Sequence, residues 1–168
     1  MAPAQTEKFS IRLAHQGDVG VLSPWAGAAY IAEALDEQNN GKRLIFLAFV
    51  EGELAGYAHL NFFPQYVPFN RLKIPEIQDL FVLPVFRRQG IARDLIMECE
   101  DAAKSRGMGE IGLGVGVGAS FGAAQRLYTR MGYMPDGAGV VFERDVVTEG
   151  AMKPVDNRLC LMLIKSLV

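Results

Sequence analysis

The chain has 168 residues, of which 50% are hydrophobic and 21% charged, and this fits a single domain over residues 1–168 with one substantial core. Its net charge of −2 argues against a general nucleic-acid binder and against a protein of the bilayer surface, because both normally carry a strong basic excess. We therefore interpret local arginines as ligand contacts.

Hydropathy and the rare residue types predict location and metal content. No apolar run approaches the length of a membrane span, and residues 1–8 lack the charged start and apolar centre of a signal peptide. We therefore expect a cytoplasmic protein that binds no membrane. Cys99 and Cys160 each lie in an apolar pattern, which favours buried thiols. Because His15 and His59 are the only histidines, no metal cluster has recognisable spacing, and we expect no metal.

The first part of the chain predicts a strand, two helices and a hairpin. Residues 9–13 alternate apolar and polar side chains as a strand does, and Asp18 can cap the helix that follows. Residues 25–35 carry a second helical stripe. The strand-like runs 43–50 and 54–62 join at a Glu-Gly-Glu turn and predict a β-hairpin. Residues 63–75 contain three prolines with Tyr66 and Phe69, so we expect a long aromatic loop of the kind that often lines a site.

A strand and a helix are predicted in the middle of the chain, with a short loop between them. Residues 77–82 form an apolar, β-branched run that Pro84 ends, and helical spacing begins at Ala92 and stops at Gly107. The loop sequence is Arg-Arg-Gln-Gly-Ile-Ala, residues 87–92. Its small residues let a ligand approach backbone N–H groups at the positive end of the helix dipole, beside two arginines. This pattern predicts a phosphate or pyrophosphate site.

The last third of the chain begins with a glycine-rich strand. Residues 110–117 read as a strand, and every second residue from Gly112 to Gly118 is glycine, so we expect a backbone or a thin ligand against that bare face. These glycines do not have the spacing of a dinucleotide fingerprint. Ser120 can cap a helix that carries Tyr128 on its apolar stripe and ends at Gly132. Further strands are predicted at residues 133–134 and 140–142, on either side of a turn at 135–137, and at 158–167.

Two of these segments resemble the GCN5-related N-acetyltransferase (GNAT) superfamily. Arg87, Gly90 and Ala92 match its Q/R-x-x-G-x-G/A signature of acetyl-CoA binding, and residues 124–133 are similar to its A-x-x-L-Y-x-x-x-G-F/Y block. The resemblance covers nearly the whole chain and implies an α/β fold, a mixed sheet whose central parallel strands splay apart. One departure is Phe121, where many members carry an asparagine, so a side-chain amide contact to the cofactor is not expected.

The resemblance also implies the cofactor and its contacts. Acetyl-CoA would be the co-substrate, and the main chain of Leu80 and Val82 would contact its pantetheine arm and supply an oxyanion donor. Tyr128 lies where family members often place a tyrosine that protonates the departing thiolate; the alternative is a core tyrosine with a satisfied hydroxyl. The loop residues expected to bind the cofactor are Arg87, Arg88, Gln89, Gly90, Ile91, Ala92 and Arg93.

The general base has several candidates. Glu76 has the spacing from Arg87 at which the histone-acetylating branch places its glutamate, and the alternative is a solvated carboxylate at a strand start. A free glutamate has a pKa of about 4.3 and is a poor base for an ammonium, so burial or a water relay would have to assist it. Asp79 is the rival residue, and many family members work through water alone.

The sequence therefore predicts an acetyl-CoA-dependent N-acetyltransferase that acts on a primary amine of a small molecule or peptide. The alternative is a non-catalytic acyl-CoA-binding or sensory module on the same fold, which Tyr128 disfavours. A nucleotide binder is disfavoured because no P-loop lysine is present. The acceptor and the oligomeric state are not specified by the sequence, and a homodimer stays open. Acids that could favour a cationic acceptor, although scattered carboxylates are usually solvated, are Glu33, Asp36, Glu37, Glu76 and Asp79.

Overall fold

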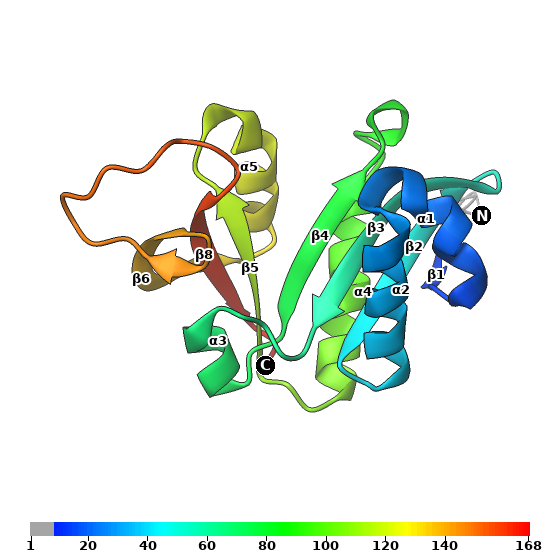
Figure 1. Ribbon diagram of the computed structural model, residues 1–168, viewed down its shortest axis with the longest axis horizontal. Helices are drawn as coiled ribbons and strands as arrows, with labels where there is room; N and C mark the ends of the chain where they lie inside the picture. The colour runs from blue at the N-terminus through cyan, green and yellow to red at the C-terminus, as the bar shows by residue number, and fades with distance from the viewer. Residues whose placement is uncertain (1–8) are drawn as a thin grey trace, which may run out of the picture. The chain divides into compact units, whose positions relative to one another are not determined.

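A computed structural model describes residues 9–168, which group into two units. The first unit runs to His59 and resumes over Asp79–Cys99, and the second contains Leu60–Gln78 and Glu100–Val168. Hydrogen bonding orders the strands β1-β2-β3-β4-β5-β8-β6-β7 in a mixed sheet (Figure 1). The mixed α/β class predicted from the sequence is confirmed. The prediction of one domain over residues 1–168 stays a prediction.

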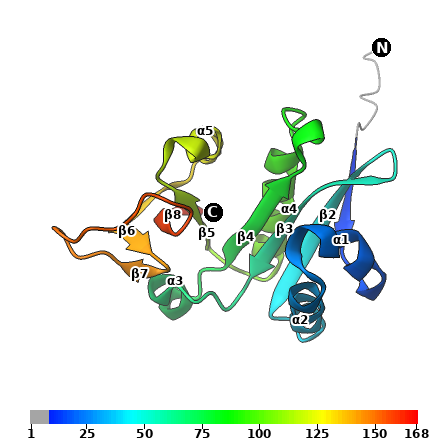
Figure 2. The same ribbon diagram turned by 45° about the horizontal axis from the view of Figure 1, so that its top comes forward.

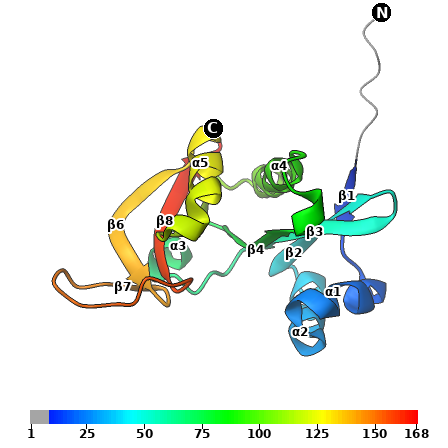
Figure 3. The same cartoon turned by 90° about the horizontal axis from the view of Figure 1, so that it is seen from above.

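The first unit is a sheet with helices on both faces. Its strands are β1 (Ser10–Leu13), β2 (Arg43–Val50), most of β3 (Glu53–Asn61) and the end of β4 (Glu76–Val82). β1 runs antiparallel to β2, with Ser10 opposite Phe49. Helices α1 (Val19–Ala26) and α2 (Ala28–Asn39) lie on one face, and the beginning of α4 (Ile91–Ser105) lies on the other (Figure 3). The core between α1, α2 and the sheet includes Leu22, Ile31, Leu35, Ile45, Leu47 and Tyr57.

Two helix predictions for this unit need correction. The helical segment expected over residues 25–35 is divided between α1 and α2, because Gly27 has a φ of 79° that an α-helix does not contain. Asp18 stands at the start of α1, but its carboxylate makes no cap hydrogen bond to that helix. It accepts two bonds of 2.8 Å from Arg12 and one of 2.8 Å from the His15 N–H. The ion pair, with its two oriented N–H groups, takes the oxygens that a cap would have used.

The second unit is built on an antiparallel set of strands. β5 (Glu110–Gly116) pairs along its length with β8 (Leu159–Ser166), and β8 pairs with β6 (Met134–Phe142). The short strand β7 (Asp145–Val146) pairs with β6 at the edge of the unit (Figure 2). Helices α3 (Val67–Leu72) and α5 (Gly122–Arg130) complete the unit. Its core includes Tyr66, Phe69, Ile74, Val141 and Met162.

Three details of the second unit differ from the sequence expectation. The aromatic loop of residues 63–75 contains α3, which ends where Lys73 enters the left-handed region at φ 56°. Ser120 lies in a 3-10 turn, Ala119–Phe121, and does not cap α5. The two strands expected around residues 135–137 are one strand, β6, because both ends pair with β8 and the segment between them bulges outward.

The glycine face of β5 is covered by side chains, so the expected backbone or thin ligand is wrong there. A Cβ at Gly112 would overlap the ring of Phe69, and one at Gly116 would overlap the ring of Phe121. At Gly114 the Met162 sulfur would lie 3.0 Å away. The glycines therefore make room for large neighbours inside this unit. Phe121, the departure from the usual asparagine, packs on Gly116.

Two further expectations concern thiols and membranes. Cys99 is buried as expected, whereas Cys160 is only half-buried, with its thiol 3.5 Å from the Asn157 carbonyl. Over residues 9–168, the structure contains no helix with both the length and the apolar character to cross a bilayer.

Candidate active site

The loop of residues 87–93 joins β4 to α4 through two residues with positive φ. Arg88 has a φ of 63° and Gly90 a φ of 87°. The first helical hydrogen bond runs from the Asp94 N–H to the Gly90 carbonyl over 3.1 Å, so the N–H groups of residues 91–93 have no helical acceptor. A Cβ at Gly90 would meet nothing within 4 Å, and the backbone here faces open space. This is the geometry that an anion site at a helix N-terminus requires.

The arginines of this loop divide into two kinds. Arg87 donates from Nε to the Val82 carbonyl over 3.0 Å, and its guanidinium lies 5.8 Å from the centre of the Phe81 ring. It therefore ties the loop to the end of β4. Arg88 and Arg93 are exposed and form no ion pair or hydrogen bond with a described residue. Their guanidinium groups are available to a phosphate.

The middle of β4 leaves regular strand geometry. Glu76 and Ile77 pair in parallel with Gly112 and Leu113 of β5. Two residues later, Asp79 has a φ of 51°, which few residues other than glycine adopt inside a strand. On the other edge, Gly56 of β3 lets the chain approach closely, since a Cβ there would lie 2.6 Å from the Phe81 carbonyl. Leu80 and Val82, the residues expected to contact pantetheine through their main chain, follow Asp79 with half-buried side chains.

Tyr128 lies on α5 in the second unit, with a buried ring beside the ring of Tyr133. Burial raises the pKa of its hydroxyl to about 12, so the hydroxyl is protonated at neutral pH. The hydroxyls of Tyr66 and Tyr133 donate to carboxylates, Asp136 at 2.6 Å and Glu100 at 2.9 Å. The Tyr128 hydroxyl makes no such bond with any residue from 9 to 168. The alternative role, a core tyrosine with a satisfied hydroxyl, would require such a bond.

Glu76 is completely buried, so the alternative of a solvated carboxylate is wrong. Its Oε1 forms an ion pair with Arg144, and its Oε2 accepts a 3.0 Å hydrogen bond from Gln78. Both oxygens are thus engaged inside the second unit. The sequence contained no signal for this pair, because Arg144 lies in the turn between β6 and β7 and is distant along the chain.

A polar cluster in the first unit was missed by the sequence analysis. Asp79 accepts a short hydrogen bond from the Tyr30 hydroxyl, and His59 lies behind it with Nδ1 3.9 Å from the Asp79 carboxylate. Arg43 contacts His59 Nδ1 at 3.0 Å and pairs with Glu37 at 2.6 Å. A histidine and an arginine within strand patterns were the available signal.

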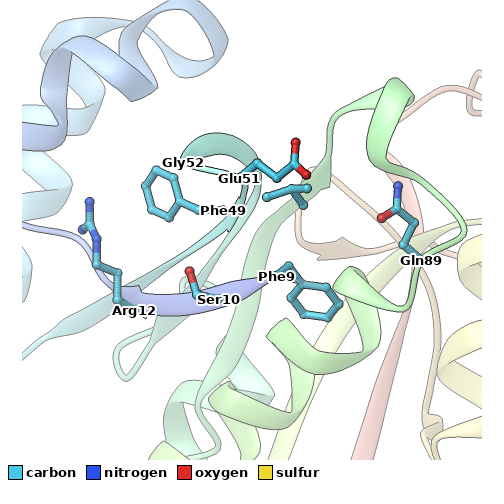
Figure 4. A pocket seen from close by; sticks show the side chains of 8 residues that line it. Phe9, Ser10, Arg12, Phe49, Glu51, Gly52 and Gln89 are labelled. Atoms are coloured by element: carbon cyan, nitrogen blue, oxygen red, sulfur yellow. The ribbon is translucent and has the colours of Figure 1, made fainter. Parts of the chain in front are cut away.

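A cavity of about 850 Å³ borders the loop of residues 87–93 within the first unit (Figure 4). Gln89 lines it from the loop, Phe9 and Arg12 from β1 and the residue before it, and Phe49 from the end of β2. The Arg12 guanidinium lies 4.7 Å from the centre of the Phe49 ring and is also paired with Asp18. The described residues contain no group of three or more His, Cys, Asp or Glu side chains that could hold a metal ion.

Comparison with known proteins decides the family. The sequence model of the acetyltransferase (GNAT) family matches residues 13–133, a stretch that includes the loop of residues 87–93 and Tyr128. The chain belongs to the GNAT acetyltransferase family. As a member, it is an acetyl-CoA-dependent N-acetyltransferase, as the resemblance implied. A comparison with curated protein sequences found no match.

Solved acetyltransferases share the fold at low sequence identity. The ribosomal-protein-alanine N-acetyltransferase of Brucella melitensis is 20% identical with a TM-score of 0.69, over 94% of this chain and 99% of that chain. YncA of Salmonella typhimurium, a putative acetyltransferase solved with acetyl-CoA, is 16% identical with a TM-score of 0.70, over 95% and 94%. The spermidine/spermine N-acetyltransferase SpeG of Vibrio cholerae is 16% identical with a TM-score of 0.68, over 95% and 93%. These likenesses establish the GNAT fold.

Proposed function

We propose that the loop of residues 87–93 binds the pyrophosphate of acetyl-CoA and that the enzyme acetylates a primary amine of a small molecule or peptide. The observation that carries the proposal is the path from Arg88 through Gly90 to the start of α4, with N–H groups and two exposed arginines available to an anion. Arg87 positions this loop through the Val82 carbonyl. Gln89, Ile91, Ala92 and Arg93 complete the contact surface, with the buried Ile91 side chain anchoring the helix start.

Tyr128 is the proposed general acid. In acetyl transfer the neutral amine nitrogen forms a bond to the thioester carbonyl carbon. The bond between that carbon and sulfur breaks, and the departing thiolate takes up a proton. The hydroxyl is protonated at neutral pH and can donate a hydrogen bond to the sulfur, while burial, which raises its pKa to about 12, makes it a weaker acid than a free tyrosine. Its lack of a partner among the described residues leaves it available for that role. The backbone N–H groups near Leu80 and Val82 are the proposed donors to the carbonyl oxygen.

Glu76 is the proposed base, in the sense that it receives a proton from the acceptor amine directly or through water. Its burial supports the role because a carboxylate removed from bulk water favours its neutral, protonated form. The ion pair with Arg144 opposes it, since Oε1 must give up that partner to take a proton. Glu76→Gln, described in the Discussion, decides between the catalytic and the structural role.

The binding half of the proposal is tested by calorimetry with acetyl-CoA and Gly90→Asp. The new carboxylate would occupy the phosphate position and oppose its charge, so we expect cofactor binding to be lost in a folded protein. Gly137→Asp is the matched control, because Gly137 has a φ of 88° and equally open surroundings in the second unit. Unchanged affinity in folded Gly90→Asp would overturn the assignment of the loop. Binding without turnover on any amine would favour the non-catalytic module instead.

A further inference from the structure

Asp79 is an isolated negative charge in the first unit. Its side chain is 44% exposed, and within residues 9–168 its one ionisable neighbour at ion-pair distance is His59, whose Nδ1 lies 3.9 Å from Oδ2. Burial lowers the pKa of His59 to about 4, so this imidazole is neutral at pH 7. Among residues 9–168, therefore, no cation is paired with the Asp79 carboxylate. A carboxylate this exposed needs no partner for stability, yet hydrogen bonds from neighbouring side chains hold it in position.

The support is a chain of hydrogen bonds behind Asp79. The Tyr30 hydroxyl donates to Oδ2 and accepts a 3.2 Å bond from Arg43 Nη1. Arg43 in turn donates from Nε to Glu37 over 2.6 Å, so the charges of Arg43 and Glu37 cancel each other. One oxygen of Asp79 is thus fixed by Tyr30, while Oδ1 accepts no hydrogen bond from a described residue. The cluster of these four residues and His59 has a net charge of −1.

His59 shows that the cluster has a second unused polar atom. Arg43 can only donate, so the 3.0 Å contact makes Nδ1 the acceptor and places the imidazole proton on Nε2. The side chain is completely buried, and Nε2 has no hydrogen-bond partner in the described part of the chain. Buried donors are normally satisfied by protein, water or ligand. The exposed Oδ1 of Asp79 is thus the atom of this cluster that is open to an external cation, whereas the buried Nε2–H is a donor that an ammonium cannot satisfy.

Aromatic rings surround this site on the same unit. The Tyr30 ring stacks on His59 at 5.9 Å and is 39% exposed. Phe81, two residues after Asp79 on β4, has its ring centre 5.7 Å from that of Tyr57 and 6.0 Å from that of Trp25. Trp25 is 47% exposed. Aromatic faces attract organic cations, and a carboxylate beside them adds a charge of the right sign.

We propose that Asp79 is a specificity residue that binds the ammonium group of a small alkylamine or arylalkylamine acceptor, with Tyr30 and Trp25 contacting its hydrocarbon part. The proposal rests on the proposed function and deepens it by naming the acceptor class. Such amines have a pKa near that of lysine, about 10.4, and are cations at pH 7, whereas a peptide amino group at about 7.7–8.0 is partly neutral. An isolated carboxylate favours the amine that is almost fully protonated at pH 7. The peptide class is an outcome of the test.

The test measures acceptor binding without turnover, by calorimetry on the enzyme saturated with CoA in place of acetyl-CoA. The probes are hexylamine and 2-phenylethylamine, with hexanol as the neutral match and an alanine-starting tripeptide as the peptide. We expect at least one of the two amines to bind about tenfold or more tightly than hexanol and the peptide. Asp79→Asn should abolish that preference, and Tyr30→Phe should reduce it, because the carboxylate then loses the hydroxyl that orients it.

Control variants distinguish a failure of the acceptor proposal from a failure of the proposed function. Glu98→Gln removes an exposed carboxylate from α4 in the same unit and should leave amine affinity unchanged. CoA affinity should be equal in all these variants, and a wild-type enzyme that failed to bind CoA would contradict the proposed function instead. The acceptor proposal is overturned if neither amine binds the CoA complex, if hexanol or the peptide binds as tightly, or if folded Asp79→Asn keeps the preference.

Discussion

Tyr128, Glu76 and His59 are three buried polar residues whose surroundings differ in kind. Tyr128 has a hydroxyl without a described partner, Glu76 has both oxygens engaged, and His59 has one engaged nitrogen and one unpaired nitrogen. Burial alone gives the same expectation for all three, namely that the charged form is disfavoured. The partners decide what each can do, and single substitutions separate the roles.

For Tyr128, removal of the hydroxyl separates proton donation from packing. If the hydroxyl protonates the thiolate, Tyr128→Phe should lower kcat by about 10²–10⁴ with little change in acetyl-CoA affinity. Since no described residue accepts a bond from this hydroxyl, the change should cost little stability. Tyr133→Phe is the matched control, because it loses a 2.9 Å bond to Glu100 and should lower stability while kcat is kept. A near-wild-type kcat in Tyr128→Phe would refute the catalytic role.

For Glu76, Glu76→Gln keeps the size of the side chain and removes the proton acceptor. A base would lose roughly 10²-fold in rate at neutral pH, and much of that loss should be recovered in alkali, where the amine is deprotonated in solution. The ion pair with Arg144 predicts a second effect, a loss of about 1–3 kcal/mol of stability, because the guanidinium loses its buried partner.

A double-mutant cycle with Arg144→Gln measures that second effect, and kinetics measure the first. Destabilised Glu76→Gln with the wild-type rate and pH profile would show that Glu76 is structural. Asp79→Asn would then be the next variant in which to look for a lost base. If neither variant changes the pH profile, a water relay is left as the route for the proton.

For His59, the pH dependence of folding is predicted. The unfolded imidazole binds a proton near pH 6.5, whereas burial lowers the folded pKa to about 4, so acid favours the unfolded state between these values. Above pH 6.5 His59 does not change the free energy of unfolding. As the pH falls to 4, His59 lowers that free energy by an amount that grows to roughly 3 kcal/mol. His59→Asn keeps an acceptor for Arg43 without a titratable ring.

Unfolding by urea at pH 7.5 and pH 4.5 checks this prediction. The difference in stability between the variant and the wild type should shift in favour of the variant at the lower pH. The pKa of Asp18 is lowered by its hydrogen bond with Arg12, so protonation of Asp18 in acid also reduces stability. This loss is equal in the wild type and in His59→Asn. An identical acid loss in wild type and variant would contradict the assignment.

At the scale of elements, local sequence signals predicted strands and helices better than their interruptions. Local residues account for three features: the hairpin of β2 and β3, the end of β4 before Pro84, and the end of α5 near Gly132, which has a φ of 93°. The division at Gly27 was missed because an apolar stripe continues across it. The single strand β6 was missed because its identity depends on pairing with β8, far along the chain.

The glycines of β5 give a prediction at this scale. Gly112→Ala should destabilise the protein by about 1–3 kcal/mol, because its Cβ would overlap the Phe69 ring in a packed core. Phe69→Leu in the same chain should recover part of the loss, since it frees space beside the new methyl group. Gly20→Ala in α1, where a Cβ meets nothing within 4 Å, should instead stabilise by about 0.5–1 kcal/mol.

Thermal or urea unfolding measures the stability of four variants: Gly112→Ala, Phe69→Leu, the double variant and Gly20→Ala. Equal stability of Gly112→Ala and wild type would mean that the glycine face tolerates a side chain, and the packing account of β5 would fail. Additive effects of Gly112→Ala and Phe69→Leu would show that the two positions do not interact.

At the scale of the whole chain, the conformation of the loop of residues 87–93 was predictable because its glycine, arginines and helix start lie together in one continuous segment. That this loop binds phosphate stays a prediction. The motif around Tyr128 is likewise continuous. The environment of Glu76 and the cluster at Asp79 were not predictable, since Arg144, Tyr30, Arg43 and His59 come from separate elements and carry no motif. Continuous motifs thus indicated the family, and the fold brought together the residues for which we propose a role in acceptor choice.

The most direct test of the central claim is the release of CoA thiol from acetyl-CoA in the presence of amines. The panel covers alkylamines, arylalkylamines, polyamines, amino acids and peptide amino termini, with the acetylated product identified by mass. The account predicts thiol release that requires both acetyl-CoA and an amine, is lost in Gly90→Asp and is kept in Gly137→Asp. Tight acetyl-CoA binding with no amine-dependent thiol release across the panel, or equal release by Gly90→Asp, would contradict it.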